Sequence, residues 1–221
     1  MQKEVYKHRL KLTKTNALRF ISHLDWQGLI LKIFRRCELN LVLSEGFNKM
    51  PKVSYSPALP IFIESNCELV NFQTYDELSE NFIETFKKNS PKGLDIIELK
   101  TPNENEPKSL ENYCQWALYS ANIKKSIYKF DEIRYIIDNC LSSDEILIEK
   151  KTKKGITKKI NYRNSLKQIE IKDENILNFI LKTGQSEIPA FRADEFLGLL
   201  FKNTDFSIKR MEFFDSDMKV I

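Results

Sequence analysis

The sequence predicts an α+β protein made of two tandem ferredoxin-like domains, each a split βαβ unit. Three observations support this prediction. The 221 residues are enough for two small domains. Both halves show the same predicted order, a strand, a helix, several strands, a helix and a strand. The polar, proline-containing segment 101–109 separates them, so domains are expected at 1–100 and 112–221 with a linker at 101–111.

The first half opens with a strand over 4–13, where Leu10 and Leu12 alternate with basic residues. Ser22 is the expected N-cap of the next helix, with Asp25 three residues further on. One apolar stripe runs along that helix at spacings of three and one, through Trp26, Leu29, Ile30, Ile33, Phe34 and Cys37. Gly28 lies inside the helix and indicates a close backbone approach.

Short strands are expected on both sides of the loop EGFNKMP at 45–51, over 39–44 and 52–56, and again over 67–74. A helix over 76–88 and a strand over 94–99 complete the first half.

The second half begins with a predicted strand over 112–121 and a helix over 130–141. EILIEK and ITKKINY form a predicted hairpin with Gly155 in its turn. A strand over 176–183, a helix over 191–201 and a strand over 206–214 follow.

Charge is distributed unevenly along the chain, although the net charge is only +4. Residues 1–60 carry a balance of +7 and residues 114–168 one of +6, while 61–113 and 169–221 carry −6 and −3. The small net charge therefore predicts opposed basic and acidic faces rather than a neutral surface.

Several classes of protein are excluded by composition. The four cysteines form no CxxC pair and only two histidines occur, so no metal site and no iron–sulfur cluster are expected. The expectation is four reduced thiols, at least two of them in the core. No apolar run approaches a membrane span and the first residues hold no apolar signal core. We expect a cytoplasmic protein without membrane contact or cofactor.

Four stretches carry a recognisable pattern: SHLD at 22–25, RRCEL at 35–39, SEGFNKMPKVSYSPALP at 44–60 and IES at 63–65. With them the chain resembles a bacterial family of unknown function whose members are described as radical-SAM-associated proteins. INYRNSL and AFRADEFLGLL are similar to later family segments, although Ala193 replaces a proline. The resemblance implies an RNA-linked role beside a separate radical S-adenosylmethionine (SAM) enzyme.

The matching region contains a candidate phosphate-binding patch. Amides of a glycine-containing turn beside lysines can hold a phosphate, and Phe47 or Tyr55 offers a stacking surface. The candidate residues are Arg19, Arg35, Arg36, Gly46, Asn48, Lys49 and Lys52. A structural alternative is equally consistent, in which Gly46 and Pro51 shape a turn and Arg35 caps the helix.

His23 and Asp25 form a candidate acid–base pair in the first helical turn. Residues two apart do not face each other on a helix, so the alternative is that Asp25 caps the helix and His23 bonds to the next strand.

A lysine-rich hairpin provides the second basic region. KKTKKGITKK at 150–159 is either a solvated edge or a basic finger over RNA, with Lys153 and Lys154 as candidate contacts. Arg163 and Arg192 match family positions and are candidates for RNA contacts or for pairing with acids such as Asp194 or Glu170.

The leading hypothesis is an RNA-binding or substrate-presenting subunit that works with a radical SAM protein on tRNA or rRNA. It predicts one continuous basic face that joins Arg19, Arg35, Lys49 and Lys52 to the hairpin. The alternatives are a metal-independent RNA-processing enzyme that uses His23, and a protein–protein adapter with an exposed apolar patch.

Overall fold

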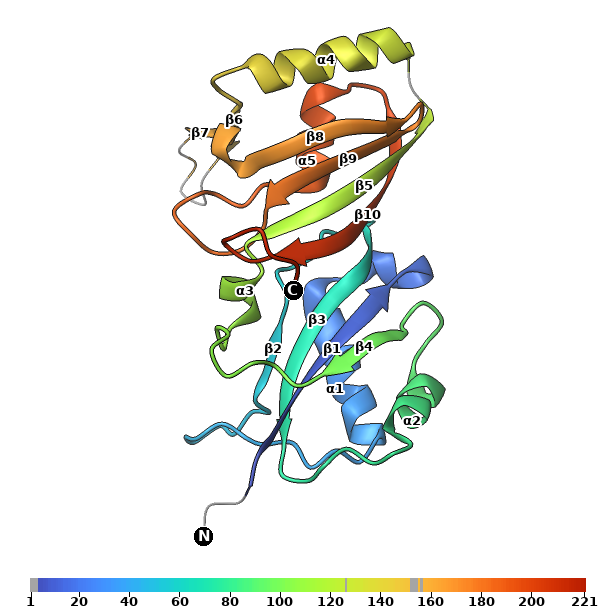
Figure 1. Cartoon of the computed structure of the whole chain (residues 1–221), viewed down its shortest axis with the longest axis vertical. Helices are drawn as coiled ribbons and strands as arrows, with labels where there is room; N and C mark the ends of the chain where they lie inside the picture. Colours follow the sequence, from blue (N-terminus) through green and yellow to red (C-terminus); the bar gives the residue numbers. More distant parts are fainter. Residues whose placement is uncertain (1–3, 126, 152–154, 156) are drawn as a thin grey trace. The chain divides into compact units, whose positions relative to one another are not determined.

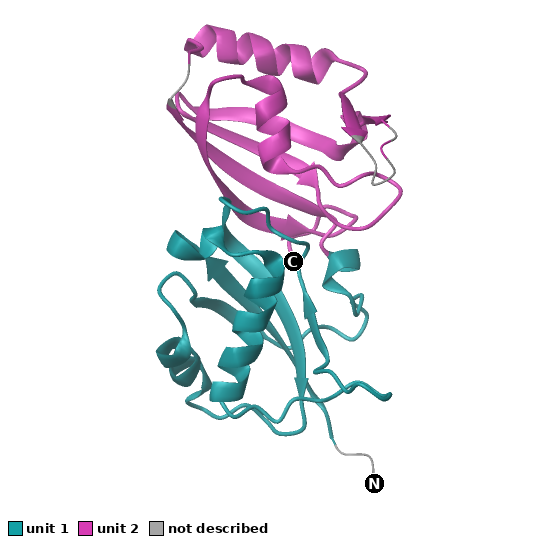
Figure 2. Ribbon diagram, turned by 180° about the vertical axis from the view of Figure 1, so that it is seen from behind, with its two compact units in different colours: residues 1–113 teal, residues 114–221 magenta. Residues whose placement is uncertain are grey.

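A computed structural model describes residues 4–125, 127–151, 155 and 157–221. The chain divides into two compact units, residues 1–113 and 114–221 (Figure 2). Each unit combines an antiparallel sheet with helices, so the protein belongs to the α+β class. The segment 101–111 falls within the first unit.

The first unit has four strands in the order β4-β1-β3-β2, and every neighbouring pair is antiparallel. Figure 1 shows α1 behind these strands. The elements are β1 (Tyr6–Lys14), the 3-10 helix η1 (Asn16–Phe20), α1 (His23–Arg36), β2 (Val53–Tyr55), β3 (Glu64–Thr74), α2 (Phe82–Asn89), β4 (Ile96–Lys100) and α3 (Leu110–Tyr113).

The core of this unit lies between the sheet and its two longer helices. Trp26, Ile30 and Phe34 of α1 are at most 1% exposed, which confirms the predicted stripe. The Phe34 ring lies 4.5 Å from that of Phe72 on β3. At the start of α1, Ser22 Oγ accepts a hydrogen bond from the Asp25 backbone N–H at 3.1 Å, so the predicted cap is present.

Gly28 is not at a close approach, contrary to the sequence prediction, because a Cβ there would meet no described atom within 4 Å. Alanine has a higher helix propensity than glycine and has room at this position. We therefore expect Gly28→Ala to raise the free energy of unfolding by about 0.5–1 kcal/mol. Urea titration measures this change, and a decrease would show that α1 needs glycine here.

His8 on β1 links stability to pH. Thr74 Oγ1 donates to the Asp76 carbonyl, so it accepts from His8 Nε2 at 2.8 Å, and the His8 ring lies 4.9 Å from Phe72. Burial lowers the pKa of His8 below its ordinary value.

Between the lowered pKa of folded His8 and its ordinary value of about 6.5, the unfolded chain binds more protons than the folded one. Stability contributed by neutral His8 is thus complete above that ordinary value and decreases as pH falls below it. We expect a fall in the free energy of unfolding from pH 7.5 to 5.5, and a shallower fall in His8→Gln. Identical pH slopes in urea titrations of the two proteins would refute this.

Two elements of the first unit differ from the prediction. The expected strand at 39–44 forms only isolated bridges at Leu41 and Leu43. The Val42 N–H donates to the Gln73 carbonyl, while its carbonyl accepts from the Lys52 N–H, so the segment makes single bonds to two neighbours and no continuous ladder with either. The expected helix at 76–88 begins only at Phe82. Side-chain contacts from Asn40 and Thr74 hold Asp76 outside the helix.

The second unit has four strands in the order β10-β5-β9-β8, again antiparallel throughout, and a separate two-stranded sheet of β6 and β7. Figure 1 shows α5 behind the four strands. The elements are β5 (Trp116–Lys125), α4 (Phe130–Ser142), β6 (Leu147–Lys151), β7 (Thr157–Asn161), the 3-10 helix η2 (Arg163–Ser165), β8 (Leu166–Asp173), β9 (Ile176–Lys182), α5 (Ala193–Leu200) and β10 (Asp205–Phe214).

Two predictions for the second half of the sequence were wrong. The predicted strand at 112–121 starts only at Trp116, because Asn112 and Tyr113 close a helical turn onto the Ser109 carbonyl. The strand β8 was missed, since register shifts after Leu166 and Ile171 break its alternation of apolar residues. The β6–β7 hairpin is therefore an insertion before β8 and β9 rather than part of the main sheet.

All four cysteines are free thiols, and Cys67, Cys114 and Cys140 are buried. Burial raises the pKa of Cys37 and Cys140, which keeps these thiols protonated and unreactive at neutral pH. No helix within the described ranges is both long and apolar enough to cross a bilayer.

Candidate nucleic-acid interface

A loop closed at its base projects from the first unit, and we call residues 44–50 the projecting loop (Figure 1). The Ser44 backbone N–H donates to the Met50 carbonyl at 2.7 Å, and the Met50 N–H donates to Ser44 Oγ at 3.0 Å. An antiparallel bridge joins Leu43 to Pro51 directly below this clasp. The clasp fixes both ends of the loop, so the residues between them are held away from the core.

The tip of the projecting loop exposes an aromatic ring, with Glu45 two residues before it and Lys49 two residues after it. Phe47 is fully exposed, Met50 is 60% exposed, and Asn48 and Lys49 are also exposed. Gly46 has φ +120°, a conformation that non-glycine residues rarely adopt. The apolar side chains of Phe47 and Met50 therefore face solvent and contribute nothing to the core. Exposed apolar side chains on a loop are typical of a recognition element.

The C-terminal end of α1 adds positive charge beside the base of this loop. A groove of about 540 Å³ is lined by Lys32 and Arg35 from α1 and by Leu43 and Pro51 from the loop stem. Arg36 is exposed in the same helical turn, and exposed Lys52 follows the stem. Arg35 and Arg36 lie at the negative end of the helix dipole, where a positive charge stabilises the helix. They are therefore also consistent with the alternative that they cap α1 and do not bind phosphate.

Arg19 does not join this basic group. It lies before α1, and the 14 residues of that helix span about 20 Å at 1.5 Å per residue. Arg19 and Arg35 therefore lie at opposite ends of the helix, which separates the predicted patch into two. Arg19 instead lies 3.7 Å from Glu64 and stacks 4.8 Å above the Phe20 ring.

Arg19, Phe20 and Phe62 form a second exposed group, which we call the Phe20–Phe62 patch. Phe20 is 51% exposed and Phe62 is 71% exposed, with their rings edge to face at 5.6 Å. The Phe62 N–H donates to the Arg19 carbonyl at 2.8 Å. Phe62 has φ +75°, which is strained for a bulky side chain, so local contacts hold the ring outward at an energetic cost.

His23 and Asp25 make different contacts in the structure. Asp25 accepts a hydrogen bond from Ser22 Oγ at 2.7 Å, as part of the helix cap. His23 Nε2 lies 2.9 Å from the Gln27 side-chain nitrogen, one turn along α1, and its ring meets Tyr55 edge-on at 6.3 Å. Burial raises the pKa of Tyr55, so that hydroxyl stays protonated. These contacts stabilise the first turns of α1, and they do not join His23 to Asp25 as an acid–base pair.

Arg163 acts as a helix cap. Its Nε donates to the Ser143 carbonyl at 2.9 Å and its guanidinium reaches the Leu141 carbonyl at 3.2 Å. These carbonyls end α4, where a cation satisfies both the unpaired oxygens and the helix dipole. Its guanidinium is thus directed at the backbone.

We expect Arg163→Gln to lower the free energy of unfolding by about 1–3 kcal/mol, because charged hydrogen bonds to the end of α4 are lost. If the wild-type protein binds RNA, the same variant should bind it with unchanged affinity. Thermal melts and binding titrations on one preparation test both parts, and unchanged stability with weakened binding would assign Arg163 to the interface instead.

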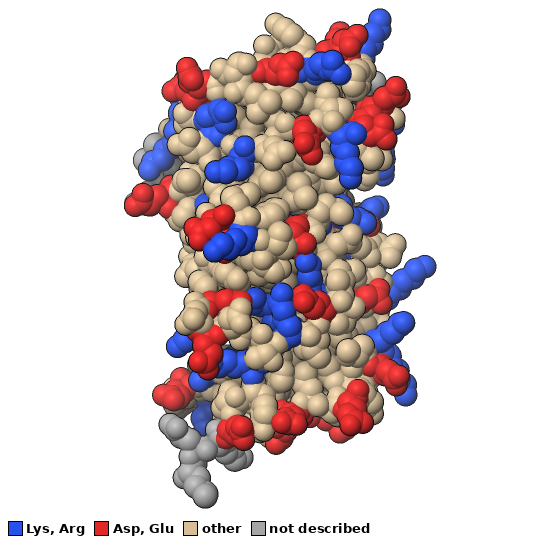
Figure 3. All heavy atoms as spheres, viewed as in Figure 1, with Lys and Arg blue, Asp and Glu red and all other residues tan. Residues whose placement is uncertain are grey.

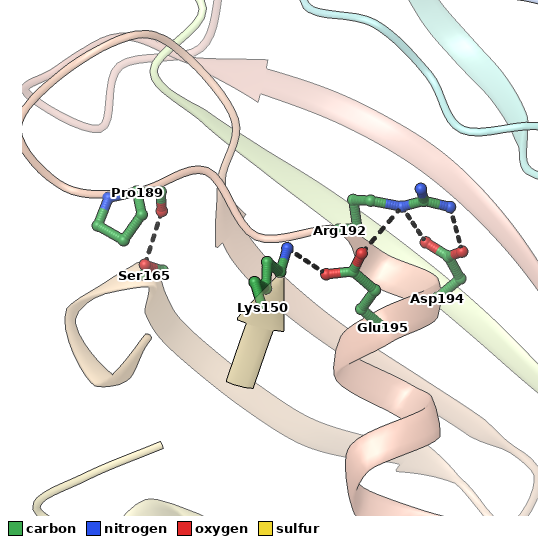
Figure 4. A network of polar contacts seen from close by, with 6 residues as sticks. All are labelled: Lys150, Ser165, Pro189, Arg192, Asp194 and Glu195. Atoms are coloured by element: carbon green, nitrogen blue, oxygen red, sulfur yellow. Dashed lines mark hydrogen bonds and ion pairs between the residues drawn. The ribbon is translucent and has the colours of Figure 1, made fainter. Parts of the chain in front are cut away.

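Arg192 belongs to a network on α5 (Figure 4). It pairs with Asp194 at 2.6 Å and approaches Glu195 at 3.7 Å, so the predicted pairing with Asp194 is present. Lys150 of β6 reaches Glu195 at 2.7 Å. Burial alone would lower the pKa of Lys150, but its hydrogen bonds to Glu195 and Tyr162 outweigh burial and raise it.

The rest of the hairpin offers little further evidence. Lys153 and Lys154 lie outside the described residues, while Lys159 pairs with Glu149 at 3.5 Å. On the side seen in Figure 3, Lys and Arg are interspersed with Asp and Glu over both units. That side is not a surface of one sign, and basic character is local, as at the C-terminal end of α1 with Lys32, Arg35 and Arg36.

Sequence reasoning missed the Ser44 clasp and the outward-turned Phe62. A serine six residues before its partner has no distinctive spacing, and a positive φ at phenylalanine leaves no trace in the residue pattern.

One family model matches residues 7–189, and its description is "Uncharacterized protein conserved in bacteria (DUF2344)". The match covers most of both units, including the projecting loop and the Phe20–Phe62 patch. No curated protein matches the chain.

Proposed function

We propose that this chain, which belongs to DUF2344, a family of uncharacterised bacterial proteins, is an RNA-binding accessory subunit. It presents a single-stranded segment of tRNA or rRNA to a separate enzyme in the cytoplasm. The partner in this proposal is a radical SAM protein, as the sequence resemblance implies. The chain itself supplies recognition rather than chemistry.

The observation that carries the proposal is the projecting loop, in which a fully exposed Phe47 and an exposed Lys49, two residues apart in the chain, lie on a clasped base. Every base offers a face for stacking, and an adjacent cation attracts the phosphate. Lys32 and Arg35 extend positive charge from the base of the loop toward α1. Stacking combined with phosphate attraction favours single-stranded RNA over a paired helix.

The Phe20–Phe62 patch is the proposed contact for the protein partner. Exposed aromatic rings with one arginine are typical of the centre of a protein interface. The patch lies at the start of α1, while Arg35 and the projecting loop lie at its end, about 20 Å away. A subunit that holds RNA at one end and an enzyme at the other needs such a separation.

The proposed architecture is two tandem ferredoxin-like domains. In support, the main sheet of each unit has the chain order strand, helix, two strands, helix, strand. Each sheet also places its fourth strand beside its first and its third beside its second. In the second unit the β6–β7 hairpin is an insertion in this arrangement.

Fluorescence anisotropy with a labelled single-stranded RNA of about ten nucleotides tests the function. We expect Phe47→Ala to weaken binding about tenfold, since stacking of a base contributes about 1–3 kcal/mol. Ile83→Ala is the matched control, because Ile83 is an apolar residue 51% exposed on α2. Equal affinities for wild type, Phe47→Ala and Ile83→Ala would refute the proposed interface.

The same labelled RNA distinguishes binding from catalysis. We expect it to stay intact during prolonged incubation with the protein. Turnover by the wild type that is lost in His23→Ala would favour the RNA-processing alternative and overturn the accessory role.

A further inference from the structure

A second groove lies on the face of the first sheet that is opposite α1. Leu10 and Phe72 point into the core with α1, so their strand neighbours Arg9 and Asn71 point to the other face. The segment 102–108 crosses that face (Figure 1). Between the segment and the strands lies a groove of about 410 Å³, within the size range of small-ligand sites.

Two contacts hold the crossing segment in place. Arg9 is 1% exposed and its guanidinium pairs with Glu106 at 2.7 Å. The Leu110 backbone N–H donates to Ser54 Oγ at 3.0 Å. One wall of the groove is therefore fixed to its floor, and the groove is preformed.

The polar groups on the floor are oriented as hydrogen-bond donors. Arg9 Nε donates to Asn71 Oδ1 at 2.8 Å, which turns the Asn71 amino group the other way. Ser54 Oγ already accepts from Leu110, so its hydroxyl proton is left to donate. A ligand for this floor needs acceptor atoms.

The rim of the groove is positive. Three exposed lysines line it, Lys7, Lys52 and Lys108. Two acids also line the groove, but Glu106 pairs with Arg9, which leaves Glu104 to oppose the lysines. Pro102 and Pro107 add flat apolar wall. These features together fit a nucleotide. The lysines can attract its phosphate, the hydrogen-bond donors can bind acceptor atoms of its base, and the apolar wall can pack against the ring.

Lys52 connects this groove to the projecting loop. Its side chain lines the groove, and its backbone N–H donates to the Val42 carbonyl at 2.8 Å, at the stem of that loop. We propose that the groove binds one unpaired nucleotide of the RNA whose neighbouring base stacks on Phe47. This inference rests on the proposed function and extends it by a specific subsite.

The test is a titration of the full ¹⁵N-labelled protein with AMP, with UMP and with inorganic phosphate, followed by NMR. We expect both mononucleotides to shift the Asn71 side-chain amide. The double variant Lys7→Gln/Lys108→Gln should weaken their binding about fivefold or more. Lys100→Gln is the matched control, because Lys100 lies on the neighbouring strand β4, pairs with Glu98 at 3.3 Å and does not line the groove.

The outcomes separate this inference from the function on which it rests. Nucleotide binding that survives in Phe47→Ala while RNA binding weakens supports both. Nucleotide binding in a protein with no affinity for RNA supports the groove as a nucleotide site and refutes the proposed function. Inorganic phosphate that binds as tightly as AMP, or no shift of Asn71 with either nucleotide, overturns the inference.

Discussion

Replacing Gly93 with alanine is expected to destabilise the first unit severely. Gly93 has φ +97°, and a Cβ there would lie 2.4 Å from the Thr15 carbonyl oxygen. That carbonyl cannot move easily, because the Thr15 N–H donates to the Gly93 carbonyl at 3.0 Å and Thr13 Oγ1 donates to the same oxygen. Positive φ alone costs about 1–3 kcal/mol and the clash adds to it, so we expect a loss of about 3 kcal/mol or more.

Urea titration of the purified variant measures this loss. Gly155→Ala is the control, because Gly155 also has a positive φ of +79° but a Cβ there would meet no described atom within 4 Å. It should lose only the conformational part, about 1 kcal/mol. Equal losses in the two variants would show that the contact between Gly93 and Thr15 is not close.

Glu106→Ala should be the second most damaging substitution. It removes the partner of Arg9, whose side chain is 1% exposed, and leaves a buried charge without its counter-ion. Breaking such a pair costs about 3–5 kcal/mol when both members are buried. Glu106 is 14% exposed, so we expect a loss near the lower limit, about 3 kcal/mol.

The double variant Arg9→Met/Glu106→Leu separates charge from packing. Replacing both charges with apolar side chains of similar size is often neutral, so most of the stability should return. A double variant as unstable as Glu106→Ala alone would show that Arg9 acts through its contacts with Asn71 and Tyr113 instead.

Helices with one apolar stripe were predictable, since a spacing of three and four residues has few other interpretations. The stripe that begins at Trp26 and the one that contains Ile133 and Ile137 both form helices whose inward residues are buried. β8 was not predictable, because its register shifts remove the period of two. α3 was missed because its four residues carry no repeating pattern.

The candidate interface was predicted only in part. The loop with Gly46 and Lys49 is local in sequence, so its proximity to the end of α1 followed from the short connection. Arg19 was grouped with Arg35 although the predicted helix from the cap at Ser22 to Cys37 already separates the two residues, so this error was avoidable. Arg163 was assigned to RNA because charge alone does not distinguish a phosphate contact from a cap on α4.

The salt dependence of RNA binding tests the central claim most directly. Affinity for the labelled single-stranded RNA is measured over a range of salt concentrations for the wild type, for Lys49→Gln and for the control Lys87→Gln, whose lysine is exposed on α2. We predict a steep loss of affinity with salt, a slope reduced by about one in Lys49→Gln, and an unchanged slope in Lys87→Gln. A flat response in the wild type, or identical slopes in all three proteins, would contradict an RNA interface at the projecting loop.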